Sequence, residues 1–217
     1  MDTSILDRFY TTGVIPVLVM DHEKDALPLA DALQAGGLPI AEITLRTPAA
    51  LGVIRQIAMQ RPDVLVGAGT VNDRRQAQAA VDAGAQFLVC PGMIEKVVLC
   101  AQKNQLPILA GSITPSEMIQ GINLGLNVLK FFPAGTMGGL KAIKSMSDPF
   151  PQLRFIPTGG IRPDNVAEYL QMEKIHAVGG SWMAKKAMIA EGRFDEITRL
   201  SQEASEIVRK VRGNHQS

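Results

Sequence analysis

The 217-residue sequence lacks the features that mark a nucleic-acid-binding protein or a membrane protein. Acidic and basic side chains nearly balance, and the formal net charge is only +1. No apolar stretch is long enough to cross a bilayer. The segment from Met1 to Ser4 also lacks the basic start and long apolar core of a secretory signal. We therefore expect a cytoplasmic protein that acts on small molecules, without nucleic-acid or membrane partners.

Cysteine and histidine are also scarce. The chain has two cysteines, Cys90 and Cys100, and three histidines, His22, His176 and His215. Both cysteines fall in predicted buried elements, so we expect reduced thiols and no disulfide. The histidines lack metal-ligand spacing, so no metal is expected, with carboxylate-bound magnesium as the alternative. His176 lies within a predicted strand and suits a packed or hydrogen-bonded histidine better than a catalyst.

Short β-branched runs alternate with amphipathic helical stretches about eight times, which leaves no room for long loops. This alternation predicts an α/β fold, a (β/α)8 TIM barrel. No linker divides the chain, so residues 1–217 are expected to form a single domain. A doubly wound open sheet is the alternative, but it usually has fewer strands and an early glycine-rich loop. The predicted strands span residues 14–20, 40–45, 64–68, 86–90, 107–110, 128–132, 153–157 and 175–178.

Two further helices are predicted at the ends of this pattern. Ile5, Leu6 and Phe9 form a short apolar stripe before the first strand. We expect a helix there that covers the bottom of the barrel. Near the other end, apolar residues between Phe194 and Val211 share one helical face, which suits a last helix that closes the outer ring.

One predicted strand contains a lysine, in the run VLKFFP at residues 128–133. Successive side chains alternate between the two faces of a strand, so Lys130 shares a face with Val128 and Phe132. Desolvation disfavours the charged form of an amine, which makes a buried lysine a usable nucleophile toward a carbonyl carbon. Lys130 is therefore a candidate for Schiff-base formation. The alternative is a lysine whose ammonium group reaches water, but the residues that follow Lys130 place it within the sheet.

Polar residues also occupy one face of the second predicted strand. The period of two places Glu42, Thr44 and Arg46 together on that face. The apolar side chains between them face the helices, so the polar set is expected inside the barrel. A buried glutamate there can move protons, and the planar guanidinium of Arg46 suits a substrate carboxylate. An internal ion pair without a catalytic role is the alternative for the acid.

The turns after the third and fourth predicted strands carry weaker signals. The run GAGT at residues 67–70 puts small side chains and the Thr70 hydroxyl where a ligand or a lid must come close. Pro91 and Gly92 form a stiff turn after Cys90. Backbone geometry alone also explains each pattern, and Thr70 also suits a role in capping the next helix.

Glycine-rich turns follow the last two predicted strands, TGG at residues 158–160 and GGS at residues 179–181, both just before a helical stretch. In TIM barrels these two loops commonly bind phosphate, because glycine exposes main-chain N–H groups and a helix N-terminus adds positive potential. Tight turns and helix caps are the alternative, but they leave the pairing of the two loops unexplained. The pattern therefore indicates a phosphorylated substrate.

Six motifs together resemble one known family. They occur in the order and spacing of the KDPG/KHG aldolases, which are class I 2-keto-3-deoxy-6-phosphogluconate aldolases, over nearly the whole chain from Thr12 to Val211. The motifs are EITLR at residues 42–46, GAGT at 67–70, PG at 91–92, KFFP at 130–133, PTGG at 157–160 and GGSW at 179–182. No single motif is specific, but six in register are.

The resemblance implies a Schiff-base aldolase of the Entner–Doudoroff pathway. Such an enzyme cleaves 2-dehydro-3-deoxy-6-phosphogluconate to pyruvate and glyceraldehyde 3-phosphate. The resemblance also implies small-molecule partners, a homotrimer and no cofactor. Two alternatives stay open at this point: cleavage of 4-hydroxy-2-oxoglutarate to pyruvate and glyoxylate, and either configuration at C4 of the sugar acid.

The resemblance further implies roles for individual residues. Lys130 matches the lysine that forms the Schiff base, and Glu42 matches the general acid/base, which acts through a water molecule. The matched substrate-binding residues are Arg46 and Thr70 at the pyruvate end, Pro91 and Phe132 along the pocket, and Thr158, Gly159, Gly160, Gly180 and Ser181 at the phosphate end.

Two other classes of protein remain as alternatives. A phosphosugar isomerase or synthase on a related barrel would use the same phosphate site, but it has no need of a lysine within a strand. A non-catalytic binding barrel would tolerate loss of Lys130 or Glu42, and both are present. Borohydride trapping with pyruvate distinguishes the three classes.

Overall fold

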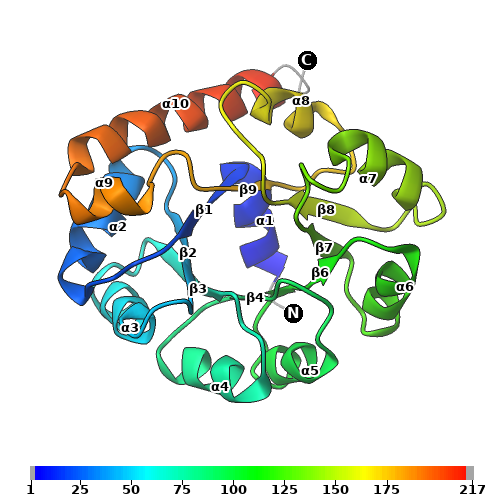
Figure 1. Ribbon diagram of the computed structural model, residues 1–217, viewed down its shortest axis with the longest axis horizontal. Helices are drawn as coiled ribbons and strands as arrows, with labels where there is room; N and C mark the ends of the chain where they lie inside the picture. Colours follow the sequence, from blue (N-terminus) through cyan, green and yellow to red (C-terminus); the bar gives the residue numbers. More distant parts are fainter. Residues whose placement is uncertain (1–2, 214–217) are drawn as a thin grey trace.

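The protein has an α/β architecture in which strands gather at the centre and helices surround them (Figure 1). The computed structural model describes residues 3–213; Met1, Asp2 and residues 214–217, which include His215, lie outside the described residues. All pairs between the strands described here are parallel. Parallel strands need crossover connections, and the helices supply them. The predicted alternation of strands and helices is confirmed.

The strands form two sheets. One sheet has six strands in the order β5-β4-β3-β2-β1-β9, and the other has three in the order β6-β7-β8. The first sheet consists of β5 (Ile108–Leu109), β4 (Leu88–Val89), β3 (Leu65–Gly69), β2 (Ile40–Thr44), β1 (Val14–Leu18) and β9 (Val178–Gly180). The second sheet consists of β6 (Gly111–Ser112), β7 (Val128–Phe131) and β8 (Arg154–Pro157).

The strand predicted at residues 107–110 is divided into β5 and β6. Only Ala110 separates the two, and its carbonyl oxygen accepts a hydrogen bond from the main-chain N–H of Lys130 at 3.0 Å. On the other side, the N–H of Cys90 donates to the carbonyl of Leu109, also at 3.0 Å. The segment therefore changes its hydrogen-bonding partner from β4 to β7 at this point, which ends one sheet and begins the other.

The last strand also differs from its prediction at residues 175–178. β9 starts only at Val178, where it pairs with Val14 of β1. Isolated bridges join the same segment to β8, one of them between Ile175 and Phe155. The beginning of the predicted strand thus pairs with β8 through one isolated bridge, and only its end pairs regularly with β1.

Helices form the outer layer (Figure 1). The last helix, α10 (Phe194–Gly213), confirms the helix predicted near the end of the chain and packs on α2 and α8. A short 3-10 helix, η1 (Glu23–Asp25), was not predicted. The other outer helices are α2 (Ala26–Ala35), α3 (Ala50–Gln60), α4 (Arg74–Asp82), α5 (Glu95–Lys103), α6 (Pro115–Asn123), α7 (Gly139–Ser147), α8 (Val166–Gln171) and α9 (Lys186–Ala190).

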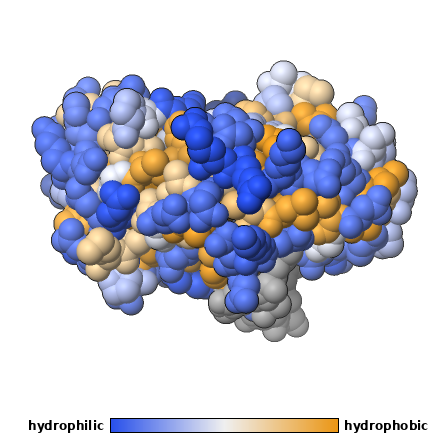
Figure 2. Space-filling view, turned by 90° about the horizontal axis from the view of Figure 1, so that it is seen from below, coloured by the Kyte–Doolittle hydropathy of each residue, from blue (hydrophilic) through white to orange (hydrophobic). Residues whose placement is uncertain are grey.

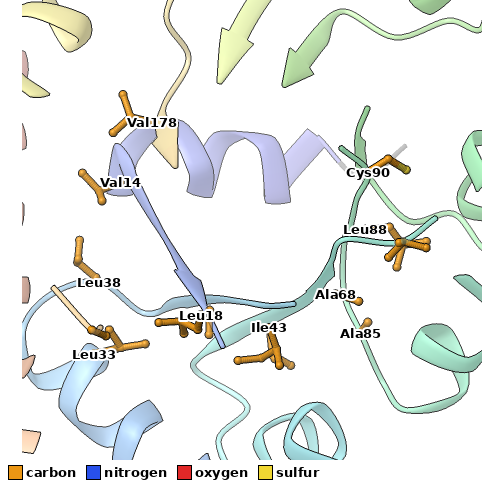
Figure 3. Packing of buried hydrophobic residues seen from close by; sticks show 14 of the residues in the cluster. Val14, Leu18, Leu33, Leu38, Ile43, Ala68, Ala85, Leu88, Cys90 and Val178 are labelled. Carbon is orange, nitrogen blue, oxygen red and sulfur yellow. The ribbon is translucent and has the colours of Figure 1, made fainter. Parts of the chain in front are cut away.

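Buried apolar side chains form one cluster on each side of the strands. The larger cluster lies between the strands and the outer helices, and Figure 3 shows Val14 and Ile43 of this cluster pointing away from α1. The smaller cluster lies on the inner side of the strands. In β7, Leu129 belongs to the outer cluster and Val128 to the inner one. Alternation along the strand therefore directs Lys130 inward, as predicted.

Helix α1 (Thr3–Thr12) fills the inner space where the strands begin. Phe9 is fully buried and meets Phe87, the residue before β4, edge to face, with ring centroids 4.9 Å apart. Ile5 and Leu6 pack against the same inner cluster. The predicted N-terminal helix is confirmed, and its apolar stripe packs where it was expected.

Hydrogen bonds hold α1 in this position. Nε2 of His176 lies 2.8 Å from the carbonyl oxygen of Leu6, and Nη2 of Arg212 donates to the carbonyl of His176 at 2.7 Å. Nη2 of Arg8 donates to the carbonyl of Asp63 at 2.9 Å. His176 is thus a packed, hydrogen-bonded histidine, as predicted.

One face of the molecule is mainly hydrophilic. Figure 2 shows this face, on which hydrophilic side chains are interrupted by hydrophobic patches. The large hydrophobic residues with high exposure are Tyr10, Met59, Leu99, Ile119 and Met137. Within residues 3–213, no helix combines the length and the apolar character that a membrane span requires.

Candidate active site

The lysine of β7 and a glutamate of β2 face each other inside the molecule. Nζ of Lys130 lies 3.4 Å from Oε1 of Glu42. The two side chains are only 8% and 3% exposed. They come from different sheets and are 88 residues apart in sequence, so the inward faces of the strands bring them together. This pair places a nucleophilic amine beside a group that can accept or return a proton.

The lack of a side chain at Gly69 makes room for Glu42. A Cβ atom at this position would lie 2.3 Å from Oε1 of Glu42. In the same strand, a Cβ at Gly67 would lie 2.5 Å from the ring of Phe87. These small residues were expected to admit a ligand or a lid. They instead admit side chains of the protein, and Gly69 lets the carboxylate lie beside the lysine.

Phe132 follows β7 and lies close to the amine of Lys130. The lysine Nζ is 5.3 Å from the centre of the Phe132 ring, which is within the range of a cation–π contact. The contact confirms that the two side chains share a face. Phe132 also lines the neighbouring cavity, so it joins the buried pair to the open part of the site.

A cavity of about 350 Å³ opens beside Phe132. Val17 and Val19, from β1 and the turn after it, form an apolar wall. The loops that follow β2, β7, β8 and β9 converge here, at the ends of parallel strands, where TIM barrels carry their active sites. The predicted substrate-binding residues that line the cavity are Arg46, Phe132, Thr158, Gly159, Gly160, Gly180 and Ser181.

The loop after β8 is held against the loop after β7. The N–H of Ala134 donates to the carbonyl of Thr158, and the N–H of Gly135 donates to the carbonyl of Gly159, both at 2.9 Å. A Cβ at Gly160 would lie 3.1 Å from Cα of Gly135, and the φ angle of Gly160 is +80°. Both the close approach and the left-handed backbone favour glycine at this position. The main chain therefore comes to the surface of the cavity without a side chain in between.

Neither glycine-rich loop leads directly into a helix. α8 begins only at Val166, and α9 begins only at Lys186. The prediction that helix N-termini next to these glycines supply positive potential is therefore wrong. Positive charge comes from side chains instead, because Arg46, Lys185 and Lys186 line the cavity.

Arg46 is exposed and lies beside the glycine-rich loops. Its Nε donates to Oγ1 of Thr44 at 3.2 Å, and this buried hydroxyl donates to the carbonyl of Leu18 at 2.8 Å. The two bonds fix the base of the guanidinium group. Arg46 was predicted to lie with Thr70, apart from the glycine-rich loops. In the structure it lines the same cavity as these loops.

Comparison with known proteins identifies the family. The family model named KDPG and KHG aldolase matches residues 5–200. The chain belongs to the KDPG and KHG aldolase family. The KHG/KDPG aldolase of Escherichia coli (strain K12) is 43% identical over 201 residues, which cover 92% of this chain and 94% of that protein. The 2-dehydro-3-deoxy-phosphogluconate aldolase of Pseudoalteromonas atlantica is 44% identical over 198 residues, 91% of this chain and 92% of that protein.

A solved structure of a KDPG aldolase has the same fold as this aldolase. The enzyme from Legionella pneumophila superposes with a TM-score of 0.88 at 40% sequence identity, and the match covers 92% of this chain and 97% of that one. In that crystal structure pyruvate was captured at low pH as a covalent carbinolamine intermediate. The similarity therefore extends over both the sequence and the three-dimensional arrangement of the family.

Two predicted substrate-binding residues of the aldolase, Thr70 and Pro91, are not among those that line the cavity. Thr70 follows β3 with a φ angle of +58°, a conformation that β-branched residues rarely adopt and that costs about 1–3 kcal/mol. Pro91 rests on Gly111, where a Cβ would lie 2.1 Å from its carbonyl oxygen. Because Gly111 pairs with Lys130 across β6 and β7, Pro91 lies on the lysine side of the site.

Both cysteines of the aldolase are free and buried, as predicted. Burial raises the pKa of the Cys90 thiol to about 12; the charge of Lys130 opposes this shift and that of Glu42 adds to it. Cys90 is therefore a neutral thiol at physiological pH. Since the thiolate is the reactive form of cysteine, Lys130 is the better nucleophile of the site.

Two further residues of the aldolase line the cavity and were not predicted from the sequence, Lys185 and Lys186. The available signal was a pair of adjacent lysines shortly after the GGSW motif. Nζ of Lys186 forms an ion pair with Oδ2 of Asp21 at 3.0 Å, which ties the start of α9 to the turn after β1. Lys185 is exposed and occupies the residue before α9.

Proposed function

We propose that this protein is an active class I aldolase that cleaves 2-dehydro-3-deoxy-6-phosphogluconate to pyruvate and glyceraldehyde 3-phosphate. The observation that carries the proposal is the buried pair of Lys130 and Glu42, whose Nζ and Oε1 atoms lie 3.4 Å apart. Relatives named for this activity align over nearly the whole chain, which supports it further. The amine itself supplies the electron sink, so the reaction needs no cofactor.

Lys130 begins the reaction as the nucleophile. Glu42 first takes a proton from the ammonium group of Lys130. The neutral amine attacks the C2 carbonyl carbon of the sugar acid, and a proton passes from the attacking nitrogen to the carbonyl oxygen to give a carbinolamine. Glu42 then protonates the C2 hydroxyl, directly or through a water molecule, and the hydroxyl leaves as water. The resulting iminium carries a positive charge on nitrogen, which can accept the electrons of the bond to be broken.

Glu42 next acts as the base for cleavage. Its carboxylate removes the proton of the C4 hydroxyl, and the electron pair of the C3–C4 bond moves to form the enamine. C4 becomes the aldehyde carbon of glyceraldehyde 3-phosphate. The enamine is then protonated at C3, and water hydrolyses the iminium to release pyruvate and restore Lys130. Glu42 returns each proton that it takes, so one carboxylate serves every step.

The two ends of the substrate bind in different parts of the site. Left-handed glycines bring main-chain N–H groups to the cavity, where they suit a phosphate. The guanidinium of Arg46 suits the carboxylate and, from its position in the cavity wall, also contacts the phosphate end. The proposed ligands are Thr158, Gly159, Gly160, Gly180 and Ser181 for the phosphate and Arg46 and Thr70 for the keto acid, with Pro91 and Phe132 along the wall.

A second substrate is 4-hydroxy-2-oxoglutarate, which would give pyruvate and glyoxylate. The Escherichia coli relative at 43% identity is named for both activities. This compound has the same keto-acid end but no phosphate, so it would use Lys130 and Glu42 without the glycine-rich loops. An isomerase or synthase is less well supported, because it would have no use for the buried lysine.

We also propose that the two sheets close into one (β/α)8 barrel that forms a single domain. Continuity of β5 and β6 on one side, and the bridges between β8 and the β9 segment on the other, support closure. The assembly is proposed to be a homotrimer and its location the cytoplasm. Exposed apolar side chains on neighbouring elements, Leu99 of α5 and Ile119 of α6, are available for contacts between subunits.

Borohydride trapping with pyruvate tests the proposed function. Reduction of the iminium should add one pyruvyl-derived mass per chain, on the peptide that contains Lys130. Lys130→Met should abolish both the adduct and turnover, because it removes the amine and keeps a side chain of similar length. Lys141→Met, at an exposed position of α7, is the matched control and should retain both. An adduct on Lys141 or Lys144, or turnover without any adduct, would contradict the proposal.

A further inference from the structure

The cavity beside the glycine-rich loops carries positive charge that its surroundings do not balance. Its lining includes Arg46, Lys185 and Lys186, but no aspartate or glutamate of the described chain. The ammonium group of Lys186 is paired with Asp21 at 3.0 Å. Arg46 and Lys185 form no ion pair within residues 3–213. Two uncompensated positive charges therefore face this cavity.

Two such charges match one phosphate monoester. A phosphate monoester carries a charge of about −1.5 to −2 at pH 7, with a second pKa near 6. Main-chain N–H groups of the glycine loops can donate hydrogen bonds, but they carry no net charge. Arg46 is already proposed to bind the keto-acid carboxylate. Lys185 is therefore the unpaired positive side chain of the cavity to which the proposed function assigns no role.

The main chain around Lys185 is fixed, whereas its side chain is exposed. The preceding residues Met183 and Ala184 are buried, and the following residue Lys186 is tied to Asp21. The carbonyl of Lys185 accepts a hydrogen bond from the N–H of Ile189 at 3.2 Å. The ammonium group can therefore reach a ligand in the cavity while the fold stays unchanged.

We propose that Lys185 is a specificity-determining residue that binds the terminal phosphate of the substrate and sets the preference for phosphorylated over phosphate-free keto acids. This inference rests on the proposed aldolase function and deepens it. A lysine acts as a compact point charge, so its contribution is greatest when the phosphate is a dianion. The preference should accordingly decline as the pH falls below the second pKa of the phosphate, near 6.

The test compares Lys185→Gln with the wild-type enzyme in steady-state kinetics. We expect the KM for the phosphorylated sugar acid to rise about tenfold, since one charge-assisted contact is lost. kcat should change little, because the contact is the same in the ground state and the transition state. Kinetics with 4-hydroxy-2-oxoglutarate and pyruvate trapping at Lys130 should stay unchanged. Lys185→Arg should restore most of the affinity, and Lys96→Gln, at an exposed position of α5, is the control.

Other outcomes overturn the proposal. An unchanged KM for the phosphorylated sugar acid in Lys185→Gln would show that Lys185 does not bind the phosphate. An equal rise in KM for the phosphorylated sugar acid and for 4-hydroxy-2-oxoglutarate would show the same. Failure of the proposed function is separable, because the wild-type enzyme would then form no pyruvate adduct at all. If 4-hydroxy-2-oxoglutarate is not cleaved by the wild-type enzyme, pyruvate trapping alone serves as the phosphate-free reference. Reduced trapping in Lys185→Gln then also counts against the proposal.

Discussion

At the scale of single residues, the chemistry depends on the contact between Lys130 and Glu42. Both groups are almost fully buried, and neither has a second ionic partner among the described residues. A buried pair of this kind is weak evidence for stability, because desolvation offsets much of the attraction between the charges. Proposed catalysis by the two groups therefore explains their burial better than a contribution to the stability of the fold does.

Replacing Glu42 by Gln should separate these two roles. The amide keeps the shape and an acceptor oxygen beside Lys130 but cannot shuttle protons. We expect kcat to fall by about two to four orders of magnitude, the usual contribution of general acid/base catalysis, and thermal unfolding to change little. Glu173→Gln is the control, because that carboxylate is 91% exposed and pairs only with Arg154. Near-native turnover combined with a much lower melting temperature would make Glu42 a structural residue instead.

The sequence was informative where a residue breaks a local pattern. Lys130 and Glu42 could be predicted because each places a charge on the inward face of an apolar strand. Lys185 could not, since an exposed lysine after a loop resembles any solvated lysine until the cavity beside it is seen. The role of Gly69 was also hidden, because the atom that needs its space belongs to Glu42 on the neighbouring strand.

At the scale of elements, the strands were located correctly but several of their ends were not. β4 is confined to Leu88–Val89, although the predicted strand spans residues 86–90. A strand ends where its ladder of hydrogen bonds ends, and that depends on the neighbouring strand. The division of β5 from β6 has the same origin, as has the late start of β9 at Val178. Local patterns show which segments are extended but not how far they pair.

The anchoring of α1 should make stability depend on pH through His176. Burial lowers the pKa of this imidazole, and the hydrogen bond to Leu6 only partly opposes the shift. A histidine whose folded-state pKa lies below its unfolded value, near 6.5, favours folding when neutral. Its stabilising contribution is therefore complete above about pH 6.5 and declines as the pH falls toward the folded-state pKa.

Melting temperatures measured between pH 5 and pH 8 test this expectation. The wild-type protein should lose stability toward the acid end more steeply than His176→Gln, which cannot take up the proton. His22→Gln is the control, because His22 is exposed and its side chain caps no helix. Identical pH profiles for the wild-type protein and His176→Gln would contradict the role assigned to this histidine.

At the scale of the whole molecule, the proposed trimer has a direct consequence for mass. The chain has a mass of 23.3 kDa, so light scattering coupled to size exclusion should give three times that value. Leu99→Asp places a charge on one of the exposed apolar positions and should shift the mass toward that of a single chain. Met59→Asp changes a residue that is 76% exposed on the distant helix α3 and serves as the control. A wild-type mass of one chain would contradict the trimer.

The overall architecture was predictable because the same unit recurs along the chain. Each repeat of strand and helix carries its own periodicity, so an error in one element does not change the inferred fold. Contacts between distant repeats were harder to predict from the sequence. The approach of Arg46 to the glycine-rich loops, and the contact of α9 with the turn after β1 through Lys186 and Asp21, depend on how distant repeats meet.

The helix that fills the beginning of the strands also determines how molecules enter and leave. Because Phe9 packs on Phe87, helix α1 closes that end of the molecule. The cavity at the opposite end is the route by which molecules enter and leave. In the proposed reaction, the fragment that carries the phosphate lies in this cavity, whereas pyruvate remains bonded to Lys130 in the interior. On this proposal the aldehyde departs before the keto acid. In the proposed reaction, the covalent bond to Lys130 and the single open end of the site together set the order of product release.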